Sequence, residues 1–330
     1  MTRPVLVTGG TGFVGSALVR ALLGAGEGVR VLVRQGSDRS NLKGLDIETI
    51  SGDLTNATAL AAAVDGCRAV FHAAADYRLF VPDPPAMYAV NVEGTRALVR
   101  AATAAGAERI VYTSSVAALG VDATGAPGDE ETPVALSDMI GHYKRSKYLA
   151  EQAVGKLVAE EAAPVVIVNP STPIGPRDIK PTPTGQIIVD AARGRIPAFV
   201  DTGLNVVHVD DVAQGHLLAW QHGVIGERYI LGGEDMTLQA ILGEVASAVG
   251  RRPPRVKLPH WSVMPLACAL EGLGRLTGST PKVTMDGVRM SKKHMYFTSA
   301  RAARELGYQW RAPSEAIRDA LLWFKQQGYI

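Results

Sequence analysis

The chain has 330 residues, of which 47% are hydrophobic and 20% charged, a composition typical of a well-packed globular protein and too apolar for disorder. Its 34 basic and 32 acidic side chains leave a net charge of +2 with no long basic run, so nucleic acid is not an expected partner. Two cysteines cannot form a disulfide framework, which favours a reducing, cytoplasmic location. We expect no signal peptide and, without about 18 consecutive uncharged apolar residues, no membrane-spanning helix.

Short β-branched segments alternate with alanine-rich segments through the first 170 residues. We expect strands at 5–8, 29–33, 47–51, 69–73, 109–113 and 165–169, because these segments are apolar throughout, as in parallel strands covered on both faces. Apolar residues recur at intervals of three and four in the predicted helices 14–25, 57–64, 87–105 and 143–160. This alternation predicts a doubly wound parallel sheet, an α/β fold of the Rossmann type.

The second half of the chain has a different pattern. Prolines at 170, 173, 176, 181 and 183 predict a stiff, irregular loop from 169 to 185. A strand at 228–231 and helices at 209–222, 238–249, 261–276 and 313–327 are expected after it. We therefore expect a dinucleotide-binding domain over 1–170 and a smaller, mostly helical substrate lobe over 171–330, allowing for a crossing back to the sheet near 203–232.

A glycine-rich turn, TGGTGFVG, separates the first strand from the first helix. Gly9, Gly12 and Gly15 give the spacing G-x-x-G-x-x-G, and residues 10, 12 and 15 also satisfy G-x-G-x-x-G. Such a turn lets bare backbone approach a pyrophosphate while the helix N-terminus points at its charge. The strand before the turn and the helix after it favour a dinucleotide site over a purely structural turn.

The end of the second strand indicates which dinucleotide binds. An acidic residue there usually accepts from the ribose 2′-hydroxyl, but this chain has Arg34, whose guanidinium would bind a 2′-phosphate. The pattern therefore favours NADP. NAD is the alternative, because the acidic Asp38 is near and because Arg34 could instead be an ordinary solvated surface residue. Asp53, after the third strand, is expected to accept from the adenine, or else to cap the next helix.

Tyr143 and Lys147 stand four residues apart on one face of a predicted helix. An ammonium beside a phenol lowers the pKa of the phenol, which could then exchange a proton with a carbonyl or alcohol oxygen. Ser115 ends the fifth strand at the carboxyl edge of the sheet and could hold that oxygen, or simply bond its own backbone. The scattered histidines have no spacing typical of a metal site, so no metal is expected.

The apolar helix predicted at 261–276 has three interpretations. It could cover a pocket for a hydrophobic polycycle, lie on a membrane surface, or be an ordinary lid or core helix.

The motifs TGGTGFVGS, GDL, FHAAA, NVEGTRAL, YTSS, YKRSK, NPSTPIGPRD and HVDDVA resemble, in this order, the extended short-chain dehydrogenase/reductase superfamily. The resemblance covers nearly the whole chain. Within the superfamily the sequence is most similar to the hopanoid-associated sugar epimerase group and to proteins like dihydroflavonol 4-reductase and 3β-hydroxysteroid dehydrogenase. The resemblance implies that Ser115 orients the substrate, that Tyr143 is the acid/base, and that Lys147 binds the ribose and activates Tyr143.

Together with the residue patterns, the resemblance predicts two further sets of residues. The cofactor set is Gly9, Gly12, Phe13, Val14, Gly15, Arg34, Asp53, Leu54, Ala73, Ala74, Ala75, Thr113, Lys147, Asn169, Pro170 and Ser171. The substrate set is Tyr77, Ser115, His142, Thr172 and Arg177.

The expected function is that of an NADP-dependent oxidoreductase which moves a hydride between nicotinamide and a carbonyl or secondary alcohol of a small or lipid-like substrate. The first alternative is a sugar epimerase or dehydratase that retains bound NAD. The second alternative is a non-catalytic NADP-binding protein. Either a monomer or a homodimer is expected.

Overall fold

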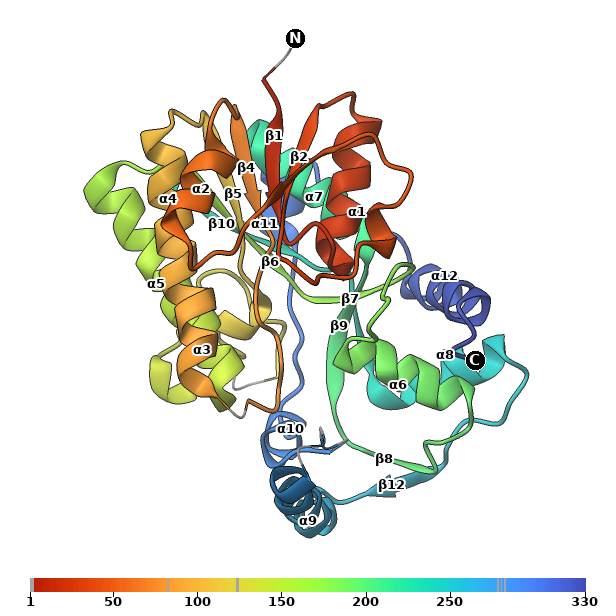
Figure 1. Ribbon diagram of the computed structural model, residues 1–330. Helices are drawn as coiled ribbons and strands as arrows, with labels where there is room; N and C mark the ends of the chain where they lie inside the picture. The colour runs from red at the N-terminus through yellow and green to blue at the C-terminus, as the bar shows by residue number, and fades with distance from the viewer. Residues whose placement is uncertain (1–2, 82, 123–124, 278, 280, 282) are drawn as a thin grey trace.

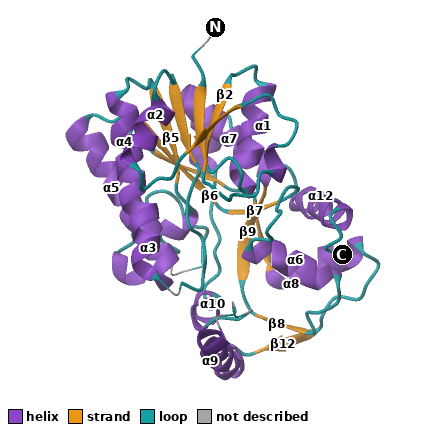
Figure 2. Ribbon diagram, viewed as in Figure 1, coloured by secondary structure: helices purple, strands orange, loops and turns teal. Residues whose placement is uncertain are grey.

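The computed structural model describes residues 3–330 except 82, 123–124, 278, 280 and 282. Its centre is a seven-stranded parallel sheet in the order β10-β6-β5-β4-β1-β2-β3 (Figures 1 and 2). The strands are β1 Val5–Thr8, β2 Val29–Val33, β3 Glu48–Ser51, β4 Ala69–His72, β5 Arg109–Thr113, β6 Val165–Pro170 and β10 Arg228–Leu231. The predicted doubly wound sheet is confirmed. β10, from the second half of the chain, returns to pair with β6.

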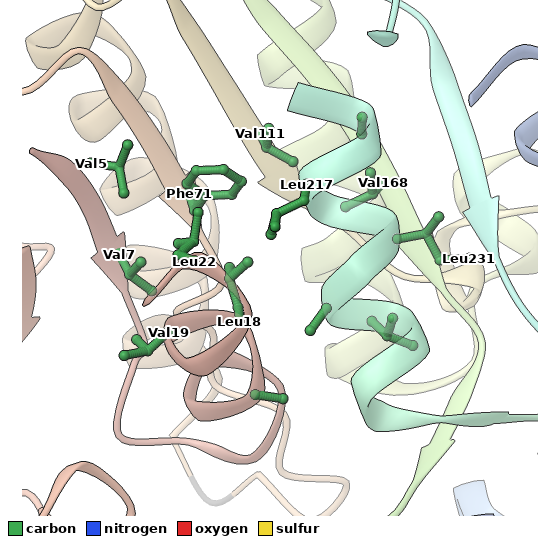
Figure 3. Close-up of a cluster of buried hydrophobic side chains, with 14 of the residues drawn as sticks. Val5, Val7, Leu18, Val19, Leu22, Phe71, Val111, Val168, Leu217 and Leu231 are labelled. Carbon is green, nitrogen blue, oxygen red and sulfur yellow. The ribbon is translucent and has the colours of Figure 1, made fainter. Parts of the chain in front are cut away.

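Helices cover both faces of the sheet because successive side chains of each strand point to opposite sides. Val5 and Val7 face one apolar cluster, shown in Figure 3, whereas Leu6 faces the other. The first cluster is closed by α1 Phe13–Gly24, α7 Val209–His222 and α11 Ala300–Leu306, and the second by α2 Ala57–Val64, α4 Thr95–Ala104 and α5 Gly141–Glu161. Both faces are therefore dry, as the uniformly apolar strands predicted.

The remainder of the second half packs beside the sheet. Its apolar core lies between α6, α8, α12 and a three-stranded sheet of order β11-β9-β7. The elements are β7 Thr172–Ile174, α6 Pro183–Ala192, β9 Gly203–His208, β11 Glu234–Thr237, α8 Leu238–Ala248 and α12 Pro313–Gln326. A further end of the molecule is formed by β8 Ala198–Val200, β12 Val256–Leu258, α9 His260–Thr277 and α10 Met285–Met290 (Figure 1). The expected mostly helical C-terminal part is confirmed.

Two predicted elements differ in the structure. The single helix expected at 87–105 is α3 Pro84–Tyr88, a π-helical turn Ala89–Gly94 and then α4. The turn brings Gly94 against Leu54, where a Cβ would lie 2.8 Å from the Leu54 Cβ. The loop expected at 169–185 instead contains β7 and the start of α6. Its prolines are tolerated because β7 is an edge strand and Pro183 occupies the first turn of α6.

Three short 3₁₀ turns complete the regular structure, at Ser40–Leu42, Val116–Ala118 and Leu136–Asp138. In the described part of the chain, no helix combines the length and hydrophobicity that crossing a bilayer requires.

A line of buried hydrogen bonds crosses from β1 to α4 through His72. The Thr95 hydroxyl donates to the Asn91 carbonyl oxygen at 2.7 Å, so it must accept from His72 Nε2 at 2.8 Å. His72 Nδ1 is then unprotonated and accepts from the Thr8 hydroxyl at 2.7 Å. The ring is therefore held as a single neutral tautomer, and burial, aided by the charge of Lys147, lowers the pKa of His72 to about 3.

This low pKa predicts a loss of stability in acid. Between the ordinary value of 6.5 and about 3, the unfolded chain binds a proton at His72 that the folded chain does not. The contribution of His72 is thus complete above pH 6.5 and decreases as the pH falls, by about 1.4 kcal/mol per pH unit. His72→Gln cannot titrate, so urea unfolding should show the stability difference between wild type and variant shrinking from about pH 7 to about pH 5. A constant difference would contradict this assignment.

Candidate active site

The loop after β1 forms a cradle that requires glycine. Gly9 has a φ of +74°, and a Cβ there would lie 2.6 Å from the backbone nitrogen of Ala74. A Cβ on Gly15 would lie 2.1 Å from the Gly9 carbonyl oxygen, to which the Gly12 N–H donates at 2.9 Å. α1 begins at Phe13, directly after this turn. Bare backbone at a helix N-terminus fits a pyrophosphate.

Arg34 and Asp53 follow neighbouring strands, β2 and β3, at the same edge of the sheet. Asp53 accepts hydrogen bonds from the Thr55 N–H at 2.9 Å and the Thr55 hydroxyl at 2.7 Å. Burial acts to raise the pKa of Asp53, but these bonds and the charge of Arg34 outweigh it and lower the pKa. The cap of α2 is Asn56, whose Oδ1 accepts from Ala59 N at 3.0 Å, so Asp53 is not the helix cap.

The end of β4 is lined by small side chains. Ala73, Ala74 and Ala75 follow His72 and are partly buried, while Leu54 beside them is buried. Because these side chains are short, a flat ligand could lie directly against the backbone that follows β4, next to the glycine cradle.

Lys147 is buried on α5, one turn after Tyr143. Its Nζ donates to the Thr113 carbonyl oxygen at 2.8 Å and lies 5.2 Å from the centre of the Tyr112 ring. Burial lowers the pKa of Lys147 to about 8, although the carboxylate of Glu151 opposes this effect. An ammonium with one carbonyl partner keeps two further N–H donors for a ligand such as a ribose hydroxyl.

Tyr143 and Ser115 meet at the N-terminal end of α5. Burial raises the pKa of Tyr143, and a hydrogen bond with the Ser115 side chain lowers it by a smaller amount. The Ser115 Oγ also accepts from the Ala117 N–H at 3.1 Å, so both roles considered for Ser115 are present. The expected lowering of the Tyr143 pKa by Lys147 is not found, because Lys147 Nζ is directed at Thr113 and the Tyr112 ring.

Asn169, at the end of β6, fixes the backbone of Ser115. Its Nδ2 donates to the Ser115 carbonyl oxygen at 3.1 Å and to Glu151 Oε2 at 2.9 Å. The buried Asn169 Oδ1 and Ser171 Oγ have no hydrogen-bond partner among the described residues. Pro170, which lies between them, has no backbone N–H that could bond to either oxygen. Such unpaired polar atoms beside Ser115 suit the amide or ribose of a nicotinamide dinucleotide, which the glycine cradle also fits.

The predicted substrate residues do not all come together. Tyr77 is 47% exposed, and its hydroxyl is close enough to influence the pKa of Tyr143. The Tyr88 hydroxyl shares a hydrogen bond of 3.2 Å with His142 Nδ1.

Thr172 lies in β7 and is partly buried. Arg177 forms an ion pair with Asp210, at the start of α7. Its guanidinium is therefore already neutralised by a protein carboxylate.

Other residues near the site were not predicted from the sequence. Thr113 Oγ1 donates to Nε2 of the buried His216, whose Nδ1 donates to the Val212 carbonyl oxygen. Lys144, beside Tyr143, lines a cavity of about 180 Å³ between the start of α5 and the segment after α10. Glu151 stands four residues after Lys147, a helical spacing that could have identified it. Nothing in the sequence pattern indicates a role for His216 or Lys144.

Comparison with known proteins identifies the family. The model described as the "NAD dependent epimerase/dehydratase family" matches residues 5–232, more than half of the chain. A Synechocystis protein named "Putative dihydroflavonol 4-reductase" is 47% identical over 98% of this chain and 95% of its own length. Sterol demethylase protein B of Methylococcus capsulatus is 36% identical over 98% of this chain and 99% of its own length.

Solved structures agree with these relatives. The crystal structure of gox2253 has a TM-score of 0.90 and 54% identity over 99% of each chain. A nucleoside-diphosphate-sugar epimerase from Pseudomonas aeruginosa has a TM-score of 0.82 and 26% identity over the full length of both chains. The predicted resemblance is confirmed: this chain belongs to the NAD-dependent epimerase/dehydratase family and is an NAD(P)-dependent oxidoreductase of the extended short-chain dehydrogenase/reductase superfamily.

Proposed function

We propose that this enzyme interconverts a ketone and a secondary alcohol on a lipid-like substrate, with NADP as cofactor and Tyr143 as the acid/base. The observation that carries the proposal is the pairing of Tyr143 with Ser115 one helical turn from the buried Lys147, at the sheet edge where the glycine cradle opens. The bound nicotinamide would supply or accept the hydride.

The protein's own part is to hold and move a proton. Burial raises the pKa of Tyr143, so its hydroxyl is a neutral donor that can protonate a carbonyl oxygen. The Ser115 hydroxyl would bind the same oxygen. Lys147, with a pKa of about 8, is mostly protonated at neutral pH, and its two free N–H donors would hold a ribose hydroxyl of the cofactor beside Tyr143. In the reverse direction Tyr143 would take the proton from the alcohol.

The substrate class rests on the relatives and on Arg177. Two relatives have names that refer to sterols. One is sterol demethylase protein B, and the other is the mouse sterol-4-alpha-carboxylate 3-dehydrogenase, which is 29% identical over 92% of this chain. Arg177, the one cationic member of the predicted substrate set, is already paired with Asp210 and does not offer a free charge to the phosphate of a nucleotide sugar. Both observations favour a lipid-like substrate over a nucleotide sugar.

The preference for NADP rests on Arg34. It is exposed after β2, where a 2′-phosphate would lie, and its charge lowers the pKa of Asp53 and of Asp76. Asp38, the nearby acid, accepts from its own turn at Ser40 N, 2.9 Å away. A guanidinium at this position would favour a phosphate over a hydroxyl.

A second function, a sugar epimerase that retains NAD, is favoured by the family description and by the Pseudomonas aeruginosa structure. The two functions differ in how they hold the cofactor. Dinucleotide released from freshly purified, denatured protein should be nearly absent for the proposed reductase, and protein recovered empty should bind NADPH more tightly than NADH. About one NAD per chain would instead identify the epimerase.

Tyr143→Phe removes only the hydroxyl that carries the proton. Turnover of a ketone substrate should fall by about 10²- to 10⁴-fold, because proton transfer by a positioned side chain contributes that much. Fluorescence titration should show NADPH binding unchanged. Tyr148→Phe, on the same helix, is the matched control and should retain activity. Loss of NADPH binding in Tyr143→Phe would mean that the residue is structural.

Arg34→Glu should reverse the cofactor preference. Losing a hydrogen bond to a charged phosphate costs about 1.5–3 kcal/mol, so NADPH binding should weaken by about ten- to a hundredfold while NADH binding is kept. The measurement is the ratio of the two dissociation constants. Arg318→Glu on α12 makes the same charge change and should leave the ratio unaltered. An unchanged ratio in Arg34→Glu would refute the assignment of this residue.

A further inference from the structure

Exposed apolar side chains gather in one short part of the chain. Twelve large hydrophobic residues are exposed in the described structure, and six of them lie between residues 256 and 276. They are Val256, Leu258, Trp261, Leu266, Leu273 and Leu276. Trp261 is 78% exposed and Leu276 is 87% exposed, so these are surface side chains and not core residues with one exposed edge.

The helix α9 has its apolar face outward. Exposed Trp261, Leu266, Leu273 and Leu276 recur at helical spacing, and the exposed positions between them whose side chains the structure describes are uncharged. The opposite face is buried and contains the carboxylate of Glu271, which accepts from the Met285 N–H at 2.6 Å. An ordinary surface helix has the reverse arrangement, with apolar residues inside and charged residues outside.

Positive charge is concentrated in the segment of the chain that contains β12, α9 and α10. Residues 251–293 contain nine Lys or Arg and two Asp or Glu, a net charge of +7, while the rest of the chain carries −5 of the total of +2. Five of these basic residues are exposed and form no ion pair with any described residue. Arg255 precedes β12, and Lys292 and Lys293 follow α10, whereas Arg251 and Arg252 lie beside α6 and α8.

The same region adjoins the candidate active site. β12, α9 and α10 form one end of the molecule (Figure 1), and α10 lies against the start of α5. A Cβ on Gly141 would lie 2.9 Å from Asp286 Oδ2, and Lys144 Nζ donates to Met295 Sδ at 3.5 Å. A partner bound to this end of the molecule would therefore lie close to the turn of α5 that carries Tyr143.

We infer that the end formed by β12, α9 and α10 binds the surface of a bilayer that contains anionic lipid. The outward apolar face would enter the boundary between headgroups and acyl chains, where tryptophan is favoured, and the unpaired basic residues would bind lipid phosphates. Charge complementarity decides the occupant, because a second copy would bring the same exposed, unpaired basic residues against this end. The inference does not depend on the proposed reaction, although a membrane surface would deliver a lipid-like substrate beside Tyr143.

Co-flotation of the full chain with vesicles tests the inference. The chain should float with vesicles of equal parts phosphatidylcholine and phosphatidylglycerol, bind phosphatidylcholine alone more weakly, and be released by high salt. Replacing Arg255 and Lys292 together with glutamine should weaken binding by about twentyfold or more, at about fivefold for each charge. Arg304→Gln with Arg318→Gln is the control of equal charge change and should bind normally.

A second pair of variants tests how much the apolar side chains contribute to vesicle binding. Leu273 and Leu322 are each 55% exposed, but only Leu273 lies on α9. Leu273→Ser should weaken vesicle binding by about tenfold, and Leu322→Ser on α12 should not. Failure of the wild type to bind the anionic vesicles at low salt, or equal binding by both serine variants, would overturn the inference. A dimer in sedimentation analysis that Leu273→Ser dissociates would also overturn it, by identifying a second copy as the occupant.

Discussion

The line of buried hydrogen bonds through His72 is the constraint that joins the glycine cradle to the part of the candidate site that contains Tyr143. Thr8 ends β1, where the glycine cradle begins, and Thr95 starts α4, so a single neutral imidazole fixes the distance between them. The line continues through Asn91, whose Nδ2 donates to the Ser146 hydroxyl, and Ser146 donates to the Tyr143 carbonyl oxygen. Buried polar groups are costly unless every partner is present, so this line tolerates little displacement of either half.

The π-helical turn at Ala89–Gly94 follows from the same constraint. A regular helix would rotate Asn91 away, but the extra residue in this turn lets the Asn91 side chain contact both Asp76 and Ser146. Asn91 Oδ1 accepts from the Asp76 N–H at 2.7 Å, so the loop that follows the β4 alanines is held by the same side chain. One side chain in the irregular turn therefore joins three segments of the candidate site: the loop that contains Asp76, the turn itself, and α5 at Ser146.

The sheet and the glycine cradle were predictable, and the candidate site residues could be proposed, because all of them depend on local pattern. Uniformly apolar strands, the glycine spacing and the four-residue interval between Tyr143 and Lys147 are visible within short stretches of sequence. The roles of Asn91, Lys144 and His216 were not predictable, since their partners Ser146, Met295 and Thr113 lie between 55 and 151 positions away and are met only after folding. The pKa of Tyr143 was mispredicted for a related reason: spacing places Lys147 on the correct face, but only the structure shows its Nζ directed at Thr113.

The return of β10 to the sheet explains how the second half of the chain acts on the site. Arg228, at the start of β10, pairs with the buried Glu151 at 3.2 Å, and Glu151 also accepts from Asn169, which holds the Ser115 carbonyl oxygen. Without Arg228 the buried carboxylate would lose its direct ion-pair partner and keep only the Asn169 hydrogen bond and the charge of Lys147. The position of Ser115 therefore depends on a strand over 100 residues later in the chain, so a displacement of β10 would disturb the residue that meets Tyr143.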